Sequence, residues 1–137
     1  MKFEKPYYPG VWAKLFDAEE EGVKATPSDE WRWGFSDEAI LRALGPYKLI
    51  CFCERFRAAN PCPWNDIPGY LPARIYLMNK HHWSFHVVSE MTTEELMLAL
   101  HLELTALRLN PEESEPIRQW ANGRQCRDLL DLHLEQP

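Results

Sequence analysis

Two histidines, His82 and His86, are the side chains in this sequence whose type and spacing come closest to catalytic machinery. Polar and apolar residues alternate around them, which predicts a strand with both imidazoles on one face. Four positions along a strand span about 13 Å, so the pair is too far apart to share one metal ion. An imidazole is the commonest general acid or base at neutral pH, so a small hydrolase or nuclease using His82 and His86 is one hypothesis. A polar sheet face without a catalytic role is the favoured interpretation.

Three cysteines, Cys51, Cys53 and Cys62, form a second group. Their spacing does not match a zinc finger or ribbon, whose paired ligands lie about two to four residues apart. A metal site completed by His81 or His82 is the less favoured hypothesis, and buried, unreactive thiols are the favoured one. The sequence also lacks a nucleophile elbow, a phosphate-binding glycine loop and a nucleotide-binding fingerprint. We therefore predict no cofactor and favour a protein that is not an enzyme.

A proline-rich stretch over residues 60–72 contains two aromatic residues that are candidates for binding a partner, Trp64 and Tyr70. Its prolines, together with Asn65 and Gly69, predict a loop. Tryptophan and tyrosine are enriched at interface hot spots, and prolines reduce the entropy that a loop loses on binding. Most of the six tryptophans are expected in the core, because each buries a large apolar area.

The net charge of −6 is concentrated in residues 89–115, which contain seven glutamates and one basic residue, Arg108. The charges of the rest of the chain sum to zero. A solvated helix face is the favoured interpretation, and a surface for a basic partner protein is the alternative. This charge disfavours direct binding to nucleic acid or to anionic membranes, although an acidic surface could imitate nucleic acid in a basic groove. The acidic candidates for partner binding are Glu94, Glu95, Glu103, Glu112, Glu113 and Glu115.

A long helix is predicted over residues 93–109. Thr92 and Glu95 have the spacing of a capping box at its start, and Asn110-Pro111 opens the next helix. The helix has two apolar stripes, so two of its faces must be covered. The first stripe is formed by Leu96, Met97, Leu100, Leu104 and Leu107. The second stripe either packs under the C-terminal helices or forms a homodimer interface, and its members are Leu98, Leu102 and Leu109.

The other patterns predict short helices and a small sheet. Alternation predicts paired strands over 73–79 and 82–89. Residues 47–56 favour a central strand because both faces are apolar, although 54–59 would also suit a helix. Trp31 and Trp33 suggest a short extended segment. Helices are predicted at four further places: 11–21 ending at Gly22, 36–44 ending at Gly45-Pro46, 116–121 and 126–134.

These elements predict an α+β fold for a single domain of residues 1–137. We expect a small antiparallel sheet of about three strands, packed by one long helix and short C-terminal helices. The length and the hydrophobic fraction of 45% are ordinary for one globular domain. No apolar run has the length of a signal peptide or a membrane span, so we expect reduced thiols and a cytoplasmic location.

The favoured function is a non-enzymatic protein-binding module that acts through an acidic helical surface and the aromatic, proline-rich loop. Small inhibitors, immunity proteins and phage-encoded anti-defence proteins have this general character. The partner would be another protein with a basic surface. The hydrolase or nuclease using His82 and His86, and a homo-oligomeric structural subunit, are the two alternatives.

Overall fold

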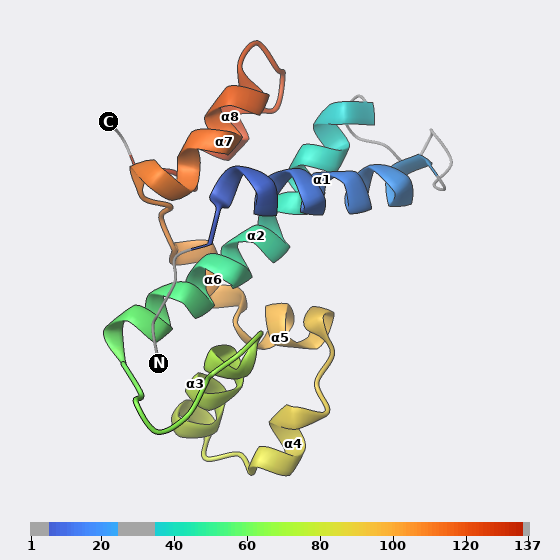
Figure 1. Cartoon of the computed structure of the whole chain (residues 1–137). Helices are drawn as coiled ribbons and strands as arrows, with labels where there is room; N and C mark the ends of the chain where they lie inside the picture. Colours follow the sequence, from blue (N-terminus) through green and yellow to red (C-terminus); the bar gives the residue numbers. More distant parts are fainter. Residues whose placement is uncertain (1–5, 25–34, 136–137) are drawn as a thin grey trace. The chain divides into compact units, whose positions relative to one another are not determined.

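The described chain is all-helical in the computed structural model, which describes residues 6–24 and 35–135 (Figure 1). Those residues form eight helices and no strand, with one isolated bridge between Leu109 and Leu134. The predicted α+β class and its antiparallel sheet are therefore wrong. The extended segment predicted around Trp31 and Trp33 lies outside the described residues.

The chain divides into two compact units. The middle unit comprises residues 48–106, and the terminal unit comprises the described parts of 6–47 and 107–135. Helix α2 (Phe35–Ala59) contributes to both, because the boundary falls between Tyr47 and Lys48. The prediction of a single domain over residues 1–137 stays a prediction.

An aromatic cluster forms the core of the terminal unit. Trp12, on α1 (Tyr8–Lys24), is fully buried, and its ring meets Tyr47 edge-on at a centroid distance of 5.3 Å. Trp120, on α7 (Pro111–Ala121), lies 6.3 Å from Trp12 and 4.5 Å from Phe16 in similar edge-on geometry. The helix predicted to end at Gly22 continues to Lys24, because Val23 is buried and extends the apolar face.

Helix α2 corrects two predictions. It runs through Gly45-Pro46, where a stop was predicted, and through residues 47–56, where a strand was favoured. Ala39, Ile40, Ala43 and Leu44 are buried at helical spacing, and Tyr47 continues that face. The Tyr47 hydroxyl donates to the Glu113 carbonyl at 2.5 Å, and the burial of this face outweighs the helix-breaking tendency of Gly-Pro.

The middle unit packs the second part of α2 with four shorter helices: α3 (Leu71–His81), α4 (Phe85–Ser89), α5 (Thr93–Ala99) and α6 (His101–Ala106). Arg74 on α3 donates to the Val88 carbonyl and, at 3.1 Å, to the Met91 carbonyl, and so fixes the connection from α4 to α5. The buried core of this unit consists of Leu49, Cys53, Ala73, Leu77, Val88, Leu96, Leu100 and Leu104.

The predicted strands over 73–79 and 82–89 are also helical. Ala73 and Leu77, four positions apart, are the buried residues of the first segment, which is a helical rather than an alternating pattern. Pro72 in the first turn favours the helix start. In the second segment the Ser84 hydroxyl accepts from the Val87 N–H and caps the single turn of α4.

The long helix predicted over 93–109 begins as predicted but is interrupted at Leu100. The Thr92 hydroxyl accepts from Glu95 N–H, and the Glu95 carboxylate accepts from Thr92 N–H, so the predicted capping box is confirmed. This backbone hydrogen bond from Thr92 lowers the pKa of Glu95. Leu96 before the interruption, Leu100 at it and Leu104 after it are all buried in one core, which confirms that they belong to one apolar stripe.

The second helix start, at Asn110-Pro111, is likewise confirmed. Asn110 Oδ1 accepts from Glu113 N–H at 2.8 Å, and the Glu113 carboxylate accepts from Asn110 N–H at 2.9 Å. Helix α8 (Arg127–Asp131) is shorter than the predicted helix over 126–134. Its start is held by the buried Asp37, whose carboxylate accepts from Cys126 N–H at 3.2 Å and lies 3.6 Å from Arg124.

Candidate functional site

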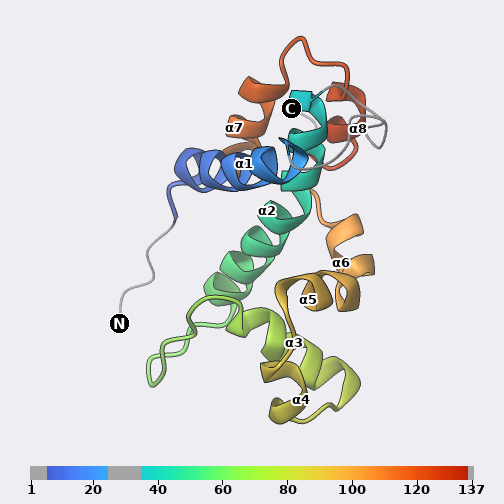
Figure 2. The same ribbon diagram turned by 90° about the vertical axis from the view of Figure 1, so that its right-hand side faces the viewer.

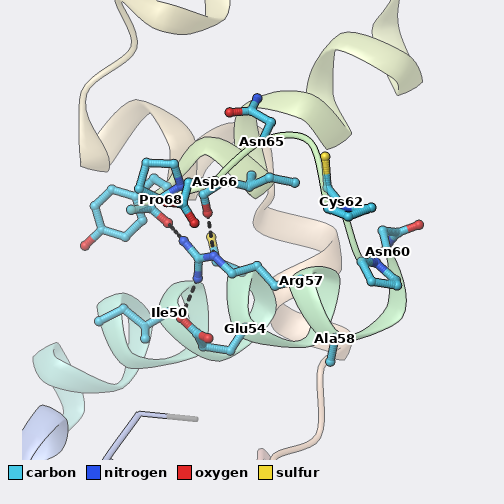
Figure 3. Close-up of a pocket in the computed structure, with 15 residues that line it drawn as sticks. Ile50, Glu54, Arg57, Ala58, Asn60, Cys62, Asn65, Asp66 and Pro68 are labelled. Carbon is cyan, nitrogen blue, oxygen red and sulfur yellow. Dashed lines mark hydrogen bonds and ion pairs between the residues drawn. The ribbon is translucent and has the colours of Figure 1, made fainter. Parts of the chain in front are cut away.

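A cavity in the middle unit lies between the end of α2 and the loop of residues 60–70. Its volume is about 870 Å³, and Figure 3 shows the side chains that surround it. The loop predicted over residues 60–72 is confirmed over 60–70, while Leu71 and Pro72 already belong to α3, and in Figure 2 the loop stands away from α2 and α3 before the chain enters α3. Apolar residues form most of the lining, and they are Ile50, Cys53, Ala58, Pro61, Pro63, Ile67, Pro68 and Tyr70.

Arg57 joins the helix to the loop. Its Nε donates to the Ile67 carbonyl at 2.5 Å and its Nη2 donates to the Gly69 carbonyl at 2.5 Å, while Nη1 donates to the Glu54 carboxylate (Figure 3). A planar guanidinium can make all three bonds at once because its donors form a rigid fork. Gly69 has a φ of +58°, a backbone conformation that glycine adopts without strain. The loop is therefore held in one position by a side chain of the adjacent helix.

The carboxylate that pairs with Arg57 is partly desolvated. The side chains of Glu54 and Arg57 are each 17% exposed. Burial raises the pKa of Glu54, and the positive charge of Arg57 opposes that rise. An ion pair removed from water in this way costs more to break than a surface pair, because the remaining charge is left without a partner.

The two aromatic candidates in the loop have different environments. Trp64 is 84% exposed, which is more than any other large hydrophobic residue of the described chain. Tyr70 is half-buried and lines the cavity, and burial raises the pKa of its hydroxyl. Trp64 is not part of the cavity lining, although its chain neighbours Pro63 and Asn65 are.

The cysteines match the interpretation of buried thiols with one exception. None of the four is in a disulfide, and Cys51, Cys53 and Cys126 are buried. Burial raises the pKa of Cys53 to about 11, and burial together with the Asp37 carboxylate raises the pKa of Cys126 to about 11. Cys62 is half-buried and lines the cavity. Within the described residues, no three His, Cys, Asp or Glu side chains are grouped so as to hold a metal ion.

Thiol labelling should separate these cysteines. At pH 8 we expect iodoacetamide to modify Cys62 first, because the raised pKa of about 11 lowers the thiolate fraction of Cys53 about a hundred-fold and burial restricts access further. Mass spectrometry of labelled peptides measures the order of labelling, and preferential labelling of Cys53 at pH 8 would contradict it.

The same shift makes the stability of the fold depend on pH. Since the folded pKa of Cys53 lies above its ordinary value of 9.0, the contribution of the protonated thiol to the free energy of unfolding is complete below pH 9 and is lost as pH rises through about 11. Urea unfolding at pH 8 and at pH 11 measures the loss of stability.

The two histidines do not share a strand face. His82 ends α3 in a left-handed conformation, with φ at 57°, and His86 lies in the single turn of α4. Both side chains are exposed, and His86 Nε2 lies 3.8 Å from Glu90 Oε1. His81 is stacked on Trp83 at a centroid distance of 4.4 Å. The strand geometry predicted for this pair is therefore wrong, while their proposed chemistry stays untested.

The six acidic candidates are divided between the two units. Glu94, Glu95 and Glu103 belong to the middle unit, where Glu95 completes a capping box and Glu103 forms an ion pair with Lys80. Glu112, Glu113 and Glu115 belong to the terminal unit. There Glu113 is buried in the capping box of α7, whereas Glu112 and Glu115 are exposed.

The second leucine stripe is divided in the same way. Leu98 on α5 and Leu102 on α6 are each 75% exposed. Leu109 is fully buried in the terminal unit, where its N–H donates to the His133 carbonyl at 2.9 Å and its carbonyl accepts from Glu135 N–H at 2.8 Å. Only Leu98 and Leu102 of this stripe therefore face solvent.

Sequence inspection missed the residues that build the cavity wall on α2. Ile50, Glu54, Arg57 and Ala58 were assigned to a segment divided between strand and helix. Their spacing of about four places them on one helical face, and Glu54 and Arg57 have the separation of a helical ion pair. The one-face spacing and the ion-pair separation would have identified these residues if the segment had been predicted as a helix.

No protein-family model, curated protein or solved structure matches this chain. None of the described helices is both long enough and apolar enough to cross a membrane.

Proposed function

We propose that this chain is a protein-binding module without a catalytic role, and that its main docking site is the 60–70 loop with the cavity behind it. The observation that supports the proposal is the exposed indole of Trp64 on a loop that Arg57 holds to the end of α2. A partner would cover Trp64 and place an apolar side chain in the cavity.

The energetics favour such a contact. Covering a tryptophan removes a large apolar area from water, and central aromatic residues often contribute about 2 kcal/mol or more to an interface. Binding usually costs entropy when a loop must be ordered, and here prolines and the Arg57 hydrogen bonds have already restricted the loop. Tyr70 lines the cavity, so the partner would contact both aromatic candidates.

Site-specific photo-crosslinking tests the proposal. A photoreactive amino acid in place of Asn65, an exposed residue of the cavity lining, should capture one partner protein in the native cell. With the purified partner, we expect Trp64→Ala to raise the Kd about 30-fold or more, since that corresponds to about 2 kcal/mol. Binding should also slow the labelling of Cys62 by iodoacetamide.

The matched control is Trp83→Ala. Trp83 belongs to the same unit and is 39% exposed, but it lies in the α3–α4 connection and not in the 60–70 loop. We expect this variant to bind with a Kd within about threefold of the unmodified chain. A Trp64→Ala variant that binds as tightly as the control would refute the proposed site.

The alternative of a homo-oligomeric subunit has one observation in its favour, the exposure of Leu98 and Leu102. Light scattering of the full chain distinguishes it, because a monomer at working concentration excludes a stable homo-oligomer. The hydrolase or nuclease alternative rests on His82 and His86, which the described structure does not group with further acids as a metal site. Full biological activity of a His82→Ala, His86→Ala variant would remove it.

A cytoplasmic site of action is part of the proposal. Four cysteines outside disulfides, one of them half-exposed at the docking site, suit a reducing compartment. The chain would therefore meet its partner inside the cell.

A further inference from the structure

The cavity behind the 60–70 loop has an apolar floor and a polar rim. At the floor, Cys53 is 1% exposed, and Ile67 and Tyr70 are half-buried. At the rim, Asn65 and Asp66 are exposed members of the same lining. The volume of about 870 Å³ is within the range of about 300–1,000 Å³ in which proteins enclose drug-sized ligands. A short segment of a partner protein, and not only one side chain, can therefore enter it.

The charge of this lining is not balanced. Its charged side chains are Glu54, Arg57 and Asp66, so one base stands against two acids. Arg57 donates to the Glu54 carboxylate and to the Ile67 and Gly69 carbonyls, and its positive charge is thereby balanced within the protein. The Asp66 carboxylate has neither a hydrogen bond nor an ion pair with any of the described residues. The negative charge that lacks a counter-ion is therefore at the rim.

This distribution disfavours an acidic ligand and favours a basic one. Arg57 is the only base in the described lining, so an anion would have to displace the Glu54 carboxylate or the loop carbonyls from it. Displacement would leave the partly buried Glu54 without its counter-ion, which is costly. A cation at the rim would instead pair with Asp66, and no contact of Asp66 among the described residues would be broken.

We propose that the partner segment that enters this cavity carries a large apolar residue next to a basic one, either arginine or lysine. The apolar side chain would lie against the floor, where its burial removes it from water. The basic side chain would form a charge-assisted hydrogen bond with Asp66 at the rim. This inference rests on the proposed docking site and names the chemistry of the segment that binds there.

Three capped dipeptides test this chemistry on the full chain: acetyl-Phe-Arg-amide, acetyl-Phe-Gln-amide and acetyl-Phe-Glu-amide. Chemical-shift changes of the Cys62 and Gly69 backbone amides in two-dimensional NMR spectra report binding. At low ionic strength we expect a Kd of about 1 mM for the arginine peptide, about threefold higher for the glutamine peptide and about tenfold higher for the glutamate peptide. These differences should disappear at about 1 M salt, because exposed charges are then screened within about 3 Å.

Two variants locate the preference at Asp66. Asp66→Asn removes the charge at the rim, so the arginine and glutamine peptides should bind with equal Kd. The matched control is Glu90→Gln, which removes an exposed carboxylate of the same unit that does not belong to the lining, and it should keep the threefold preference. Both positions are exposed, so far-UV circular dichroism should be the same for both variants and the unmodified chain.

Three results would overturn the proposal. They are a Kd above about 10 mM for the arginine peptide, equal binding of the arginine and glutamine peptides to the unmodified chain, and an equal effect of Asp66→Asn and Glu90→Gln. The docking site itself is tested with the whole partner and Trp64→Ala. A partner that depends on Trp64, combined with peptides that show no charge preference, would remove this inference and leave the proposed function in place.

Discussion

Replacement of Trp12 by alanine is expected to lower the free energy of unfolding of the terminal unit by about 3–5 kcal/mol. The indole is fully buried and contacts Tyr47 and Trp120 edge-on, so its removal leaves a large cavity and two aromatic contacts unmade. For a unit of this size such a loss corresponds to a fall in Tm of roughly 15 °C or more. Thermal unfolding followed by far-UV circular dichroism measures it.

Two comparisons identify the cause of that loss. Trp83→Ala removes the same side chain from an exposed site and should cost less than about 1 kcal/mol. Trp12→Phe keeps an aromatic ring in the cluster and also removes an indole N–H that has no hydrogen-bond acceptor among the described residues. We expect it to cost about 1 kcal/mol, because relief of the unpaired donor offsets part of the lost volume. Equal Tm values for Trp12→Ala and Trp83→Ala would contradict the aromatic core.

Replacement of Arg57 by methionine is expected to cost about 2–4 kcal/mol and to release the 60–70 loop. The substitution removes the donors to the Ile67 and Gly69 carbonyls and leaves the partly buried Glu54 without its counter-ion. Urea unfolding measures the stability loss. Faster amide hydrogen exchange in the loop and faster alkylation of Cys62 should accompany it.

The matched control is Arg42→Met on the same helix. Arg42 contacts Glu38 four residues earlier at 3.1 Å and is itself 36% exposed, about twice as much as Arg57, so its loss should cost less than about 0.5 kcal/mol. Arg57→Lys is a second test, because one ammonium cannot reproduce a fork of three hydrogen bonds. If Arg57→Lys keeps the slow exchange of the loop, the guanidinium geometry is not what holds it.

The Arg57→Met variant also tests the proposed function. Arg57→Met leaves Trp64 in place but releases the loop on which it lies. Partner binding should therefore weaken through a larger entropy cost, although the contact side chain is unchanged. A binding site that depends on Trp64 alone would tolerate this substitution.

Local chemistry explains which sequence predictions were confirmed. Thr92 and Asn110 each start a helix because their side chains satisfy a backbone N–H three residues later, an interaction that needs no distant partner. The loop over 60–70 was predictable for the same reason, since its prolines restrict their own backbone and remove hydrogen-bond donors. Such effects act within a few residues and are visible in any one sequence.

The segment 47–56 shows why the fold class was not predictable. A short apolar run fits a central strand and a buried helix equally well by periodicity. The choice was made by contacts with residues far along the chain, among them the bond from Tyr47 to the Glu113 carbonyl and the edge-on contact of Tyr47 with Trp12. The same holds for 73–79, where burial of Ala73 and Leu77 in one core favoured a helix over an alternating strand.

The proline-rich loop that carries Trp64 was determined by the sequence itself, because prolines restrict their own backbone and remove hydrogen-bond donors, whereas the exposure of the indole is seen only in the structure. The cavity behind it was decided only by the tertiary structure. Its wall exists because α2 continues through Gly45-Pro46 to Ala59 and brings Arg57 within reach of the Ile67 and Gly69 carbonyls. Burial of the preceding helical face compensates for an unfavourable Gly-Pro step, and local propensity gives no measure of that compensation.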